Sequence, residues 1–182
     1  LLKAADLGSA NAMYNLGVYH MQRGSFDQAV DWYMQAADAG YANAMTNLGF
    51  MHDQRGDFNQ AVFWWQKAAD AGSTNAMVKL GVAYRERGDF ESAVSWYMQA
   101  AEAGDSDAMY NLGNLYNSQN DGQRALDWYT KAAEAGDSDA MLKVGLACWH
   151  AGDRLQGTTW LRRAVTAGNG QASLAISMLG GN

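Results

Sequence analysis

Apolar residues recur along the chain at helical spacing, in segments of similar length that are separated by glycine. Over residues 10–23, Met13, Leu16, Gly17 and His20 fall on one face at positions i, i+3, i+4 and i+7. This is the spacing of an amphipathic helix, because 3.6 residues complete one helical turn. The pattern therefore predicts a helix over about 10–23 with one face turned toward a core.

A second helix is predicted directly after the first. Gly24 would end the first helix, because glycine readily takes the positive φ that closes a helix. Ser25, with Gln28 three residues later, has the pattern of an N-cap with a capping box. Later units place Asp57 (with Gln60), Asp89, Asp121 and Asp153 at the same cap position. The connections are too short for anything but antiparallel helix hairpins. The second helix is expected to end before Gly40 and to bury Phe26, Ala29, Val30, Tyr33, Ala36 and Ala37.

The whole pattern returns every 32 residues. The clearest columns are glycine at Gly8, Gly40, Gly72, Gly104, Gly136 and Gly168, and tryptophan at Trp32, Trp64, Trp96, Trp128 and Trp160. A hairpin of this size cannot bury its apolar faces alone, so neighbouring units must stack. We expect one repeat domain over 1–182. Its parts would be the end of a preceding repeat at 1–8, repeats at 9–40, 41–72, 73–104, 105–136 and 137–168, and a final helix and tail at 169–182.

Glycine also recurs inside the first helix of each unit, at Gly17, Gly49, Gly81, Gly113 and Gly145. Each such glycine costs about 1 kcal/mol relative to alanine, so its repetition predicts that the two helices approach closely there. The matching small face of the second helix would be Ala29, Ala61, Ala93 and Ala125. Gly157 in the fifth unit is expected to loosen that hairpin. The tryptophan column is expected in the core or between units.

Composition and charge exclude several classes of protein. The chain has 182 residues, a hydrophobic share of 48% and a net charge of −6. This acidity argues against nucleic acid as a partner, because phosphate binding needs a basic stripe. No stretch is long and apolar enough to span a membrane. No targeting signal is visible; because residue 1 is Leu, the natural N-terminus is expected upstream, and the compartment stays open, with the cytoplasm slightly favoured.

No residue pattern points to catalysis, a cofactor or a metal. His20 and His52 occupy one inward-facing column without a third ligand, and are expected to be core histidines. Cys148 and His150 are two residues apart on a helix and so point in different directions. Acidic residues at the starts of helices are expected to act as caps, namely Asp105, Asp107, Asp137 and Asp139. The sequence therefore predicts that this segment is not an enzyme.

The motifs resemble two related repeat families. Resemblance to the tetratricopeptide repeat is carried by Ala12-Met13-Tyr14-Asn15-Leu16-Gly17, Gly24, Phe26-Asp27-Gln28-Ala29-Val30-Asp31-Trp32-Tyr33 and Ala36. The junction that resembles the Sel1-like repeat (SLR) is Ala36-Ala37-Asp38-Ala39-Gly40-Tyr41-Ala42-Asn43-Ala44. The 32-residue period is shorter than the usual unit of either family, and the chain has no proline. The resemblance implies an all-α, right-handed α-solenoid of antiparallel helix hairpins, whose first helices line a concave groove that binds peptides or protein segments.

If this family geometry applies, the groove residues are Tyr14, Asn15, Val18, Asn47, Phe50, Lys79, Val82, Arg85, Tyr110, Asn111, Asn114, Lys143, Leu146 and Trp149. One column of these has side chains that can hold a peptide backbone, because an amide both donates and accepts hydrogen bonds: Asn15, Asn47, Lys79, Asn111 and Lys143. The alternative is that the asparagines form hydrogen bonds within their own units.

Three functions remain open from the sequence. The first is a scaffold that binds an extended peptide or partner protein segment in the groove. The second is a structural scaffold that self-associates through exposed repeat ends, where the last helix carries Leu174, Ile176, Met178 and Leu179. The third is a docking or regulatory domain of a longer enzyme or signalling protein.

Overall fold

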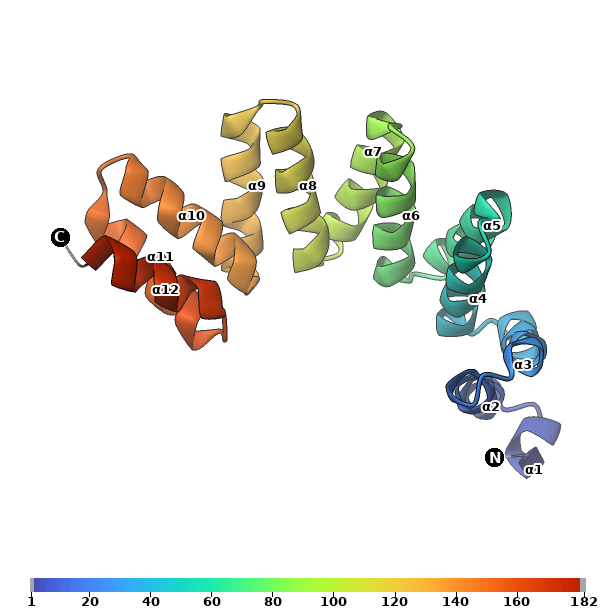
Figure 1. Ribbon diagram of the computed structural model, residues 1–182. Coiled ribbons are helices and arrows are strands. Elements are labelled where there is room, and N and C mark those ends of the chain that lie inside the picture. Colours follow the sequence, from blue (N-terminus) through green and yellow to red (C-terminus); the bar gives the residue numbers. More distant parts are fainter. Residues whose placement is uncertain (1, 181–182) are drawn as a thin grey trace. The chain divides into compact units, whose positions relative to one another are not determined.

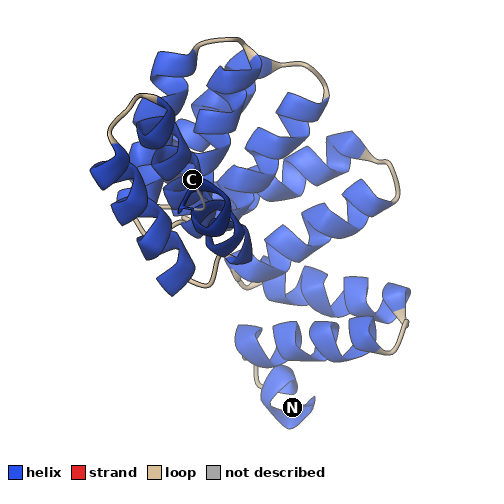
Figure 2. Cartoon of the chain, turned by 60° about the vertical axis from the view of Figure 1, so that its left-hand side comes forward, coloured by secondary structure: helices blue, strands red, loops and turns tan. Residues whose placement is uncertain are grey.

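The protein is built from α-helices joined by short connections, as the computed structural model shows for residues 2–180 (Figure 1). Those residues contain no strand (Figure 2). Contacts divide the chain into two compact units, residues 1–89 and 90–182, and within each unit successive helices pack on one another. The predicted all-α fold of antiparallel helix hairpins is confirmed.

The first unit is a succession of helices in which each packs against the next along the chain. Its helices are α1 (Leu2–Asp6), α2 (Ala10–Gln22), α3 (Phe26–Asp38), α4 (Ala42–Gln54), α5 (Phe58–Asp70) and α6 (Thr74–Glu86).

The second unit has the same construction, and its hairpins pair α8 with α9 and α10 with α11. Its helices are α7 (Phe90–Glu102), α8 (Ser106–Ser118), α9 (Gly122–Glu134), α10 (Ser138–His150), α11 (Arg154–Thr166) and α12 (Gly170–Gly180).

The 32-residue period follows from the lengths of the elements. Each helix from α2 to α11 has 13 residues, and three residues connect it to the next. In the connection after α2, the Gly24 N–H bonds to the Met21 carbonyl and the Ser25 N–H bonds to the His20 carbonyl. These two bonds form a Schellman motif, which needs a positive φ at its central residue; Gly24 supplies φ +72°. Asn120 replaces glycine after α8 with φ 61°, as an asparagine can.

At several of these turns the side chain of the following residue also caps the next helix. Asp57, Asp121 and Asp153 accept a hydrogen bond from the backbone N–H three residues on, as predicted. Asp105 and Asp137 do the same for α8 and α10. Ser25 is the N-cap residue of α3, as predicted, but the predicted capping box is wrong, because the Ser25 side chain makes no capping hydrogen bond. The Schellman bonds alone close that turn.

Alanines and one aromatic ring of each second helix fill the core of the hairpins. In the first unit Ala29, Ala36, Ala44 and Leu48 are completely buried, and they pack with Tyr33. The expected burial of the tryptophan column is only partly right: Trp160 is buried, whereas the other four tryptophans are half-buried. The buried aromatic is instead the next residue along the helix, namely Tyr33, Trp65, Tyr97 and Tyr129.

Two of the half-buried tryptophans, Trp32 and Trp64, pack against core clusters of the first unit. Trp32 lies against a cluster of Ala5, Ala12 and Leu16. Consecutive residues on a helix point about 100° apart, so residue 32 cannot share the direction of residue 33. Packing between neighbouring repeats, one of the two predicted roles of this column, is therefore confirmed for Trp32, which contacts a cluster that includes Ala5 of the preceding repeat.

In α2, α4 and α8 the glycine inside the helix makes room for that buried aromatic ring. A Cβ placed on Gly17 would lie 2.5 Å from the Tyr33 ring, and one on Gly113 would lie 2.5 Å from the Tyr129 ring. The predicted close approach is confirmed, but the partner of the glycine is an aromatic side chain. The alanines at 29, 61, 93 and 125 are buried in the same hairpins, without being what the glycine meets.

The fifth hairpin uses two glycines and is close-packed. A Cβ on Gly145 would lie 2.9 Å from Leu161, which replaces the aromatic residue there. A Cβ on Gly157 would lie 2.9 Å from both the Gly145 carbonyl oxygen and the Trp149 nitrogen. The prediction that Gly157 loosens this hairpin was wrong. Because Leu161 is smaller than a tyrosine, the two backbones approach more closely, and Gly157 permits this approach.

We predict that Gly113→Ala lowers the free energy of unfolding by about 1–3 kcal/mol, because the added methyl group overlaps the Tyr129 ring. Gly122→Ala is the matched control, since a Cβ there meets no atom within 4 Å. Chemical denaturation followed by circular dichroism measures both variants. Equal stability of the two variants would contradict the steric role of Gly113.

Candidate functional site

The predicted groove residues all lie on the first helices of the hairpins. Among them Asn15, Phe50, Lys79 and Lys143 are exposed, and the other ten are half-buried. In the first unit they are Tyr14, Asn15 and Val18 on α2, Asn47 and Phe50 on α4, and Lys79, Val82 and Arg85 on α6. In the second unit they are Tyr110, Asn111 and Asn114 on α8, and Lys143, Leu146 and Trp149 on α10.

Three of these residues meet in one small hollow of the first unit. Phe50 of α4 and Lys79 and Val82 of α6 line a depression of about 110 Å³, which we call the Phe50 depression. Its other lining residues are Asp53, Trp65, Ala83 and Glu86. Phe50 also borders a second hollow of about 310 Å³, lined by Met21, Phe26, Met51, Gln54 and Arg55.

Hydrogen bonds fix the inner wall of the Phe50 depression. The buried Trp65 ring donates from Nε1 to the Thr46 carbonyl at 3.1 Å. Thr46 itself donates its hydroxyl to the Ala42 carbonyl at 3.0 Å and lies 3.3 Å from the Ser73 hydroxyl. Since these bonds join α4, α5 and the residue before α6, the wall is preformed rather than assembled by a ligand.

The rim of the depression carries charges of both signs. Asp53 and Glu86 lie on it together with Lys79. Glu86 lies 3.8 Å from the Arg85 guanidinium, whereas no carboxylate of residues 2–180 lies within ion-pair distance of Lys79. An apolar floor with a few polar groups at its edge is typical of a site that takes a side chain of a partner.

The asparagine column is only partly available to a ligand. The Asn15 amide donates to Asn11 Oδ1 at 2.8 Å within its own helix, as the alternative reading predicted. Asn47 forms a hydrogen bond with Tyr33 of the preceding hairpin; this bond opposes part of the rise that burial causes in the pKa of Tyr33. The Asn111 side chain makes no hydrogen bond within the described part of the chain.

Asn114 has a structural role. The hydroxyl of the buried Tyr129 donates to Asn114 Oδ1 at 2.8 Å. Burial raises the pKa of Tyr129 to about 12, and the nearby Tyr110 adds to this rise. Burial also raises the pKa of Tyr110, while a hydrogen bond with Asn114 opposes that rise. Asn114 therefore fixes two tyrosines, whose rings lie 5.6 Å apart.

Other predicted groove residues also pack against their own hairpins. The Tyr14 ring lies 5.8 Å from the Tyr33 ring and 5.1 Å from the Tyr41 ring. Leu146 packs against the core cluster of the second unit. The Arg154 guanidinium lies 5.6 Å from the Trp149 ring centroid. These three side chains are half-buried, so they form part of the first-helix surface without extending far from it.

The histidines and the cysteine form no reactive cluster. His20 and His52 were expected in the core, but both are half-buried, and His52 lies 3.9 Å from Asp57 near the hairpin turn. Burial raises the pKa of the Cys148 thiol, which donates to Gln156 Oε1 at 3.4 Å. Within residues 2–180, no three His, Cys, Asp or Glu side chains are grouped to hold a metal ion.

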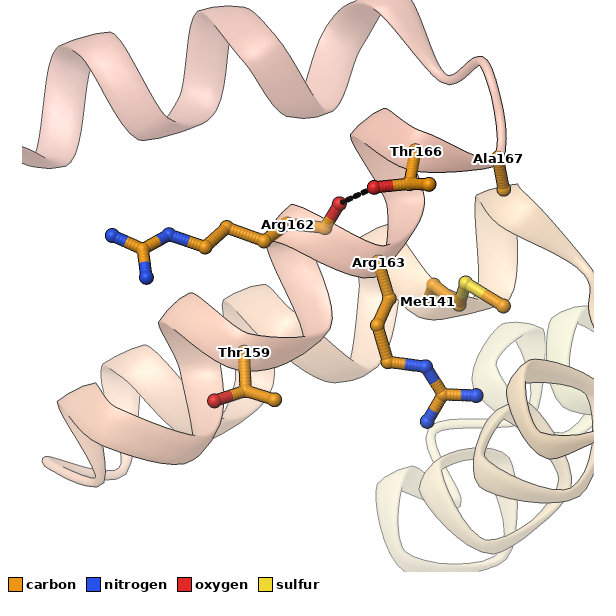
Figure 3. A pocket seen from close by; sticks show the side chains of 6 residues that line it. All are labelled: Met141, Thr159, Arg162, Arg163, Thr166 and Ala167. Atoms are coloured by element: carbon orange, nitrogen blue, oxygen red, sulfur yellow. Dashed lines mark hydrogen bonds between the residues drawn. The ribbon is translucent and has the colours of Figure 1, made fainter.

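One hollow of the second unit was missed by the sequence reasoning. It has a volume of about 520 Å³ and is lined by Met141, Thr159, Arg162, Arg163, Thr166 and Ala167 (Figure 3). Most of these residues belong to the second helix α11, to which the family resemblance assigned no ligand contact. The signal in the sequence is the pair Arg162 and Arg163, because the equivalent positions of α9 hold Thr130 and Lys131.

No helix in the described part of the chain has the length and apolar character that crossing a lipid bilayer requires.

We predict that Asn114→Ala lowers the free energy of unfolding by about 1–2 kcal/mol, because the buried Tyr129 hydroxyl loses its acceptor. In the Tyr129→Phe background the same substitution costs much less, since no hydroxyl then needs a partner. A double-mutant cycle by urea denaturation measures the coupling. A coupling of zero would show that Asn114 has no such structural role.

Comparison with known proteins identifies the repeats. A family model of the tetratricopeptide repeat matches residues 1–44 and 78–140, more than half of the chain, and a model of the Sel1 repeat matches residues 42–73. A search of curated proteins found no match.

Solved structures with similar folds include a Sel1 repeat protein from Oxalobacter formigenes. It is 28% identical, with a TM-score of 0.79, over 95% of this chain and 79% of that one. A protective antigen of uropathogenic Escherichia coli strains, c5321, which displays an SLR fold, is 28% identical with a TM-score of 0.73, over 94% of this chain and 41% of that one.

YrrB, a tetratricopeptide repeat protein described as having an unusual peptide-binding site, shares the fold at 18% identity, with a TM-score of 0.57 over 97% of each chain. The repeating helix hairpins, their inward glycines and these matches agree. The chain belongs to the tetratricopeptide repeat family and carries a Sel1 repeat within its array.

Proposed function

We propose that the protein is an interaction scaffold that binds an extended segment of a partner protein across the first-helix surface. Tetratricopeptide and Sel1 repeats generally mediate protein–protein interaction, and such proteins are typically scaffolds without enzymatic activity. The more specific proposal, that an extended peptide binds on the first helices, is supported by the Phe50 depression.

The Phe50 depression carries the proposal because it combines the features that an extended peptide needs. Phe50 is 42% exposed although it is large and apolar, and burying such a ring against a partner contributes to affinity. Lys79 stands on the rim without a carboxylate partner within the described residues. Its ammonium can donate to backbone carbonyls of a bound segment. The second hollow beside Phe50 offers a place for another side chain of the same segment.

In the second unit, Asn111 and Lys143 keep free donors on the corresponding helices. Asn111 can both donate to and accept from a peptide backbone, and Lys143 is exposed. Asn15 and Asn47 contribute less, because each already has a hydrogen-bond partner. The proposed contact residues are therefore Phe50, Lys79 and Val82 in the first unit, and, in the second unit taken by itself, Asn111 and Lys143.

A peptide selected from a phage-displayed library of linear sequences tests this proposal. We expect Phe50→Ala to weaken its binding by about tenfold or more, because a central apolar anchor is lost. Phe63→Ala is the matched control, since Phe63 is 46% exposed but lies on the second helix α5. Fluorescence anisotropy with the labelled peptide gives Kd for each variant. Equal losses in the two variants, or a peptide that protects Phe63 instead, would reject the first-helix site.

Self-association is a second candidate function, favoured by exposed apolar side chains near both ends of the array. Leu174 and Met178 of α12 are 66% and 80% exposed, and Leu2 and Leu7 are 61% and 88% exposed. Residues of this kind mark association surfaces when they gather in a patch.

Sedimentation equilibrium over a concentration series tests self-association. If it occurs, we expect the average mass to rise with concentration and Leu174→Ser together with Met178→Ser to abolish the rise. A constant monomer mass at the highest concentration would remove this candidate.

A further inference from the structure

The hollow on α11 has basic character in an acidic protein. Arg162, Arg163, Thr159 and Thr166 are exposed and line it, and we call these four residues the α11 basic patch (Figure 3). The chain has no Asp or Glu after Asp153, although its net charge is −6. No carboxylate within residues 2–180 forms an ion pair with either guanidinium. The patch therefore carries two guanidinium groups that have no ion-pair partner within residues 2–180.

The neighbouring second helix, α9, shows what is unusual about α11. Lys131 occupies the position of Arg163, and its neighbours four residues before and three after are Asp127 and Glu134. Side chains at these spacings are neighbours on a helix surface, so the two acids lower the local positive potential of the lysine, although neither is within ion-pair distance of it.

In α11 the two equivalent acids are replaced by Thr159 and Thr166, and Arg162 takes the place of Thr130. The earlier units keep the second acid as Asp6, Asp38, Asp70 and Glu102. Among these helices, only α11 has a neutral residue at the position of that acid together with a second cation beside it.

The packing of α11 holds one arginine in place. The Arg163 guanidinium lies 4.2 Å from the ring centroid of Trp160, which is 9% exposed. A cation stacked on an aromatic ring keeps its N–H edge for hydrogen bonds to carboxylates. Because the stacking restricts the side chain before binding, less conformational entropy is lost when a ligand binds.

The geometry favours several spaced carboxylates over a single phosphate group. Figure 3 shows that the Arg162 and Arg163 guanidinium groups extend from α11 in different directions, so they do not converge on one anion. The Thr159 and Thr166 hydroxyls donate to the Leu155 and Arg162 carbonyls at 2.8 and 3.0 Å. They therefore have no hydrogen left to donate to a phosphate oxygen.

We propose that the α11 basic patch is a second binding site, which takes an acidic segment of a partner protein through carboxylates that pair with Arg162 and Arg163. The site lies on a second helix and so is independent of the first-helix site. Met141 and Ala167 supply apolar surface against which the aliphatic parts of the bound side chains can pack. Charge attraction would steer the segment to this face, because the remainder of the chain is acidic and repels it.

The experiment uses a fluorescein-labelled poly-glutamate peptide and the intact chain at low salt. We expect Arg162→Gln with Arg163→Gln to weaken its binding by about tenfold or more, and binding to fall as salt rises. Thr159→Asp with Thr166→Glu, which recreates the charges of α9, should weaken binding to a similar extent while both arginines remain. Lys131→Gln is the matched control and should leave Kd within about twofold, since the acids beside Lys131 already offset it.

Circular dichroism melting checks that each variant is folded, and all the substituted side chains are exposed. Absence of poly-glutamate binding, or equal binding by the arginine variant, would overturn the proposal. Phosphatidylserine vesicles and single-stranded RNA are tested in parallel. Tighter, arginine-dependent binding of either one than of poly-glutamate would also overturn it, because the patch would then recognise phosphate.

Discussion

Each hairpin that lies within one unit depends on the contact between the middle of its first helix and one large side chain of its second helix. At Gly17 and Gly113 the missing Cβ leaves space that a tyrosine ring fills. A glycine inside a helix costs about 1 kcal/mol, and the buried ring offsets this cost because it removes a large apolar surface from water. The contact sets the spacing of the two helices, and the alanines beside it can then be buried completely.

This contact also decides which residues are left for binding. The first helix turns its glycine and leucine toward its partner, so that Phe50 and Lys79 lie on a different face. On the second helix the buried aromatic ring points toward the first helix, and other positions of the same helix face outward. Helix α11 is an example, because the Arg163 guanidinium lies over the Trp160 ring on the outer side of the helix. A repeating core thus leaves two surfaces free to vary from unit to unit.

The two surfaces have different chemistry. The Phe50 depression combines an apolar floor with mixed charges at the rim, whereas the two arginines of the α11 basic patch have no ion-pair partner within residues 2–180. The first surface suits an apolar side chain of a partner, and the second suits carboxylates.

The sequence by itself determined the helices, their caps and the repeat, because local spacing and the conformational preferences of glycine act within a few residues. It also identified the glycine column as a close contact. Only the tertiary structure decided that the contact partner is an aromatic ring, that Gly157 tightens its hairpin, and that Asn114 accepts a hydrogen bond from Tyr129. Those outcomes depend on which side chains of different helices meet, and a pattern along one helix carries no information about the direction from which the next helix approaches.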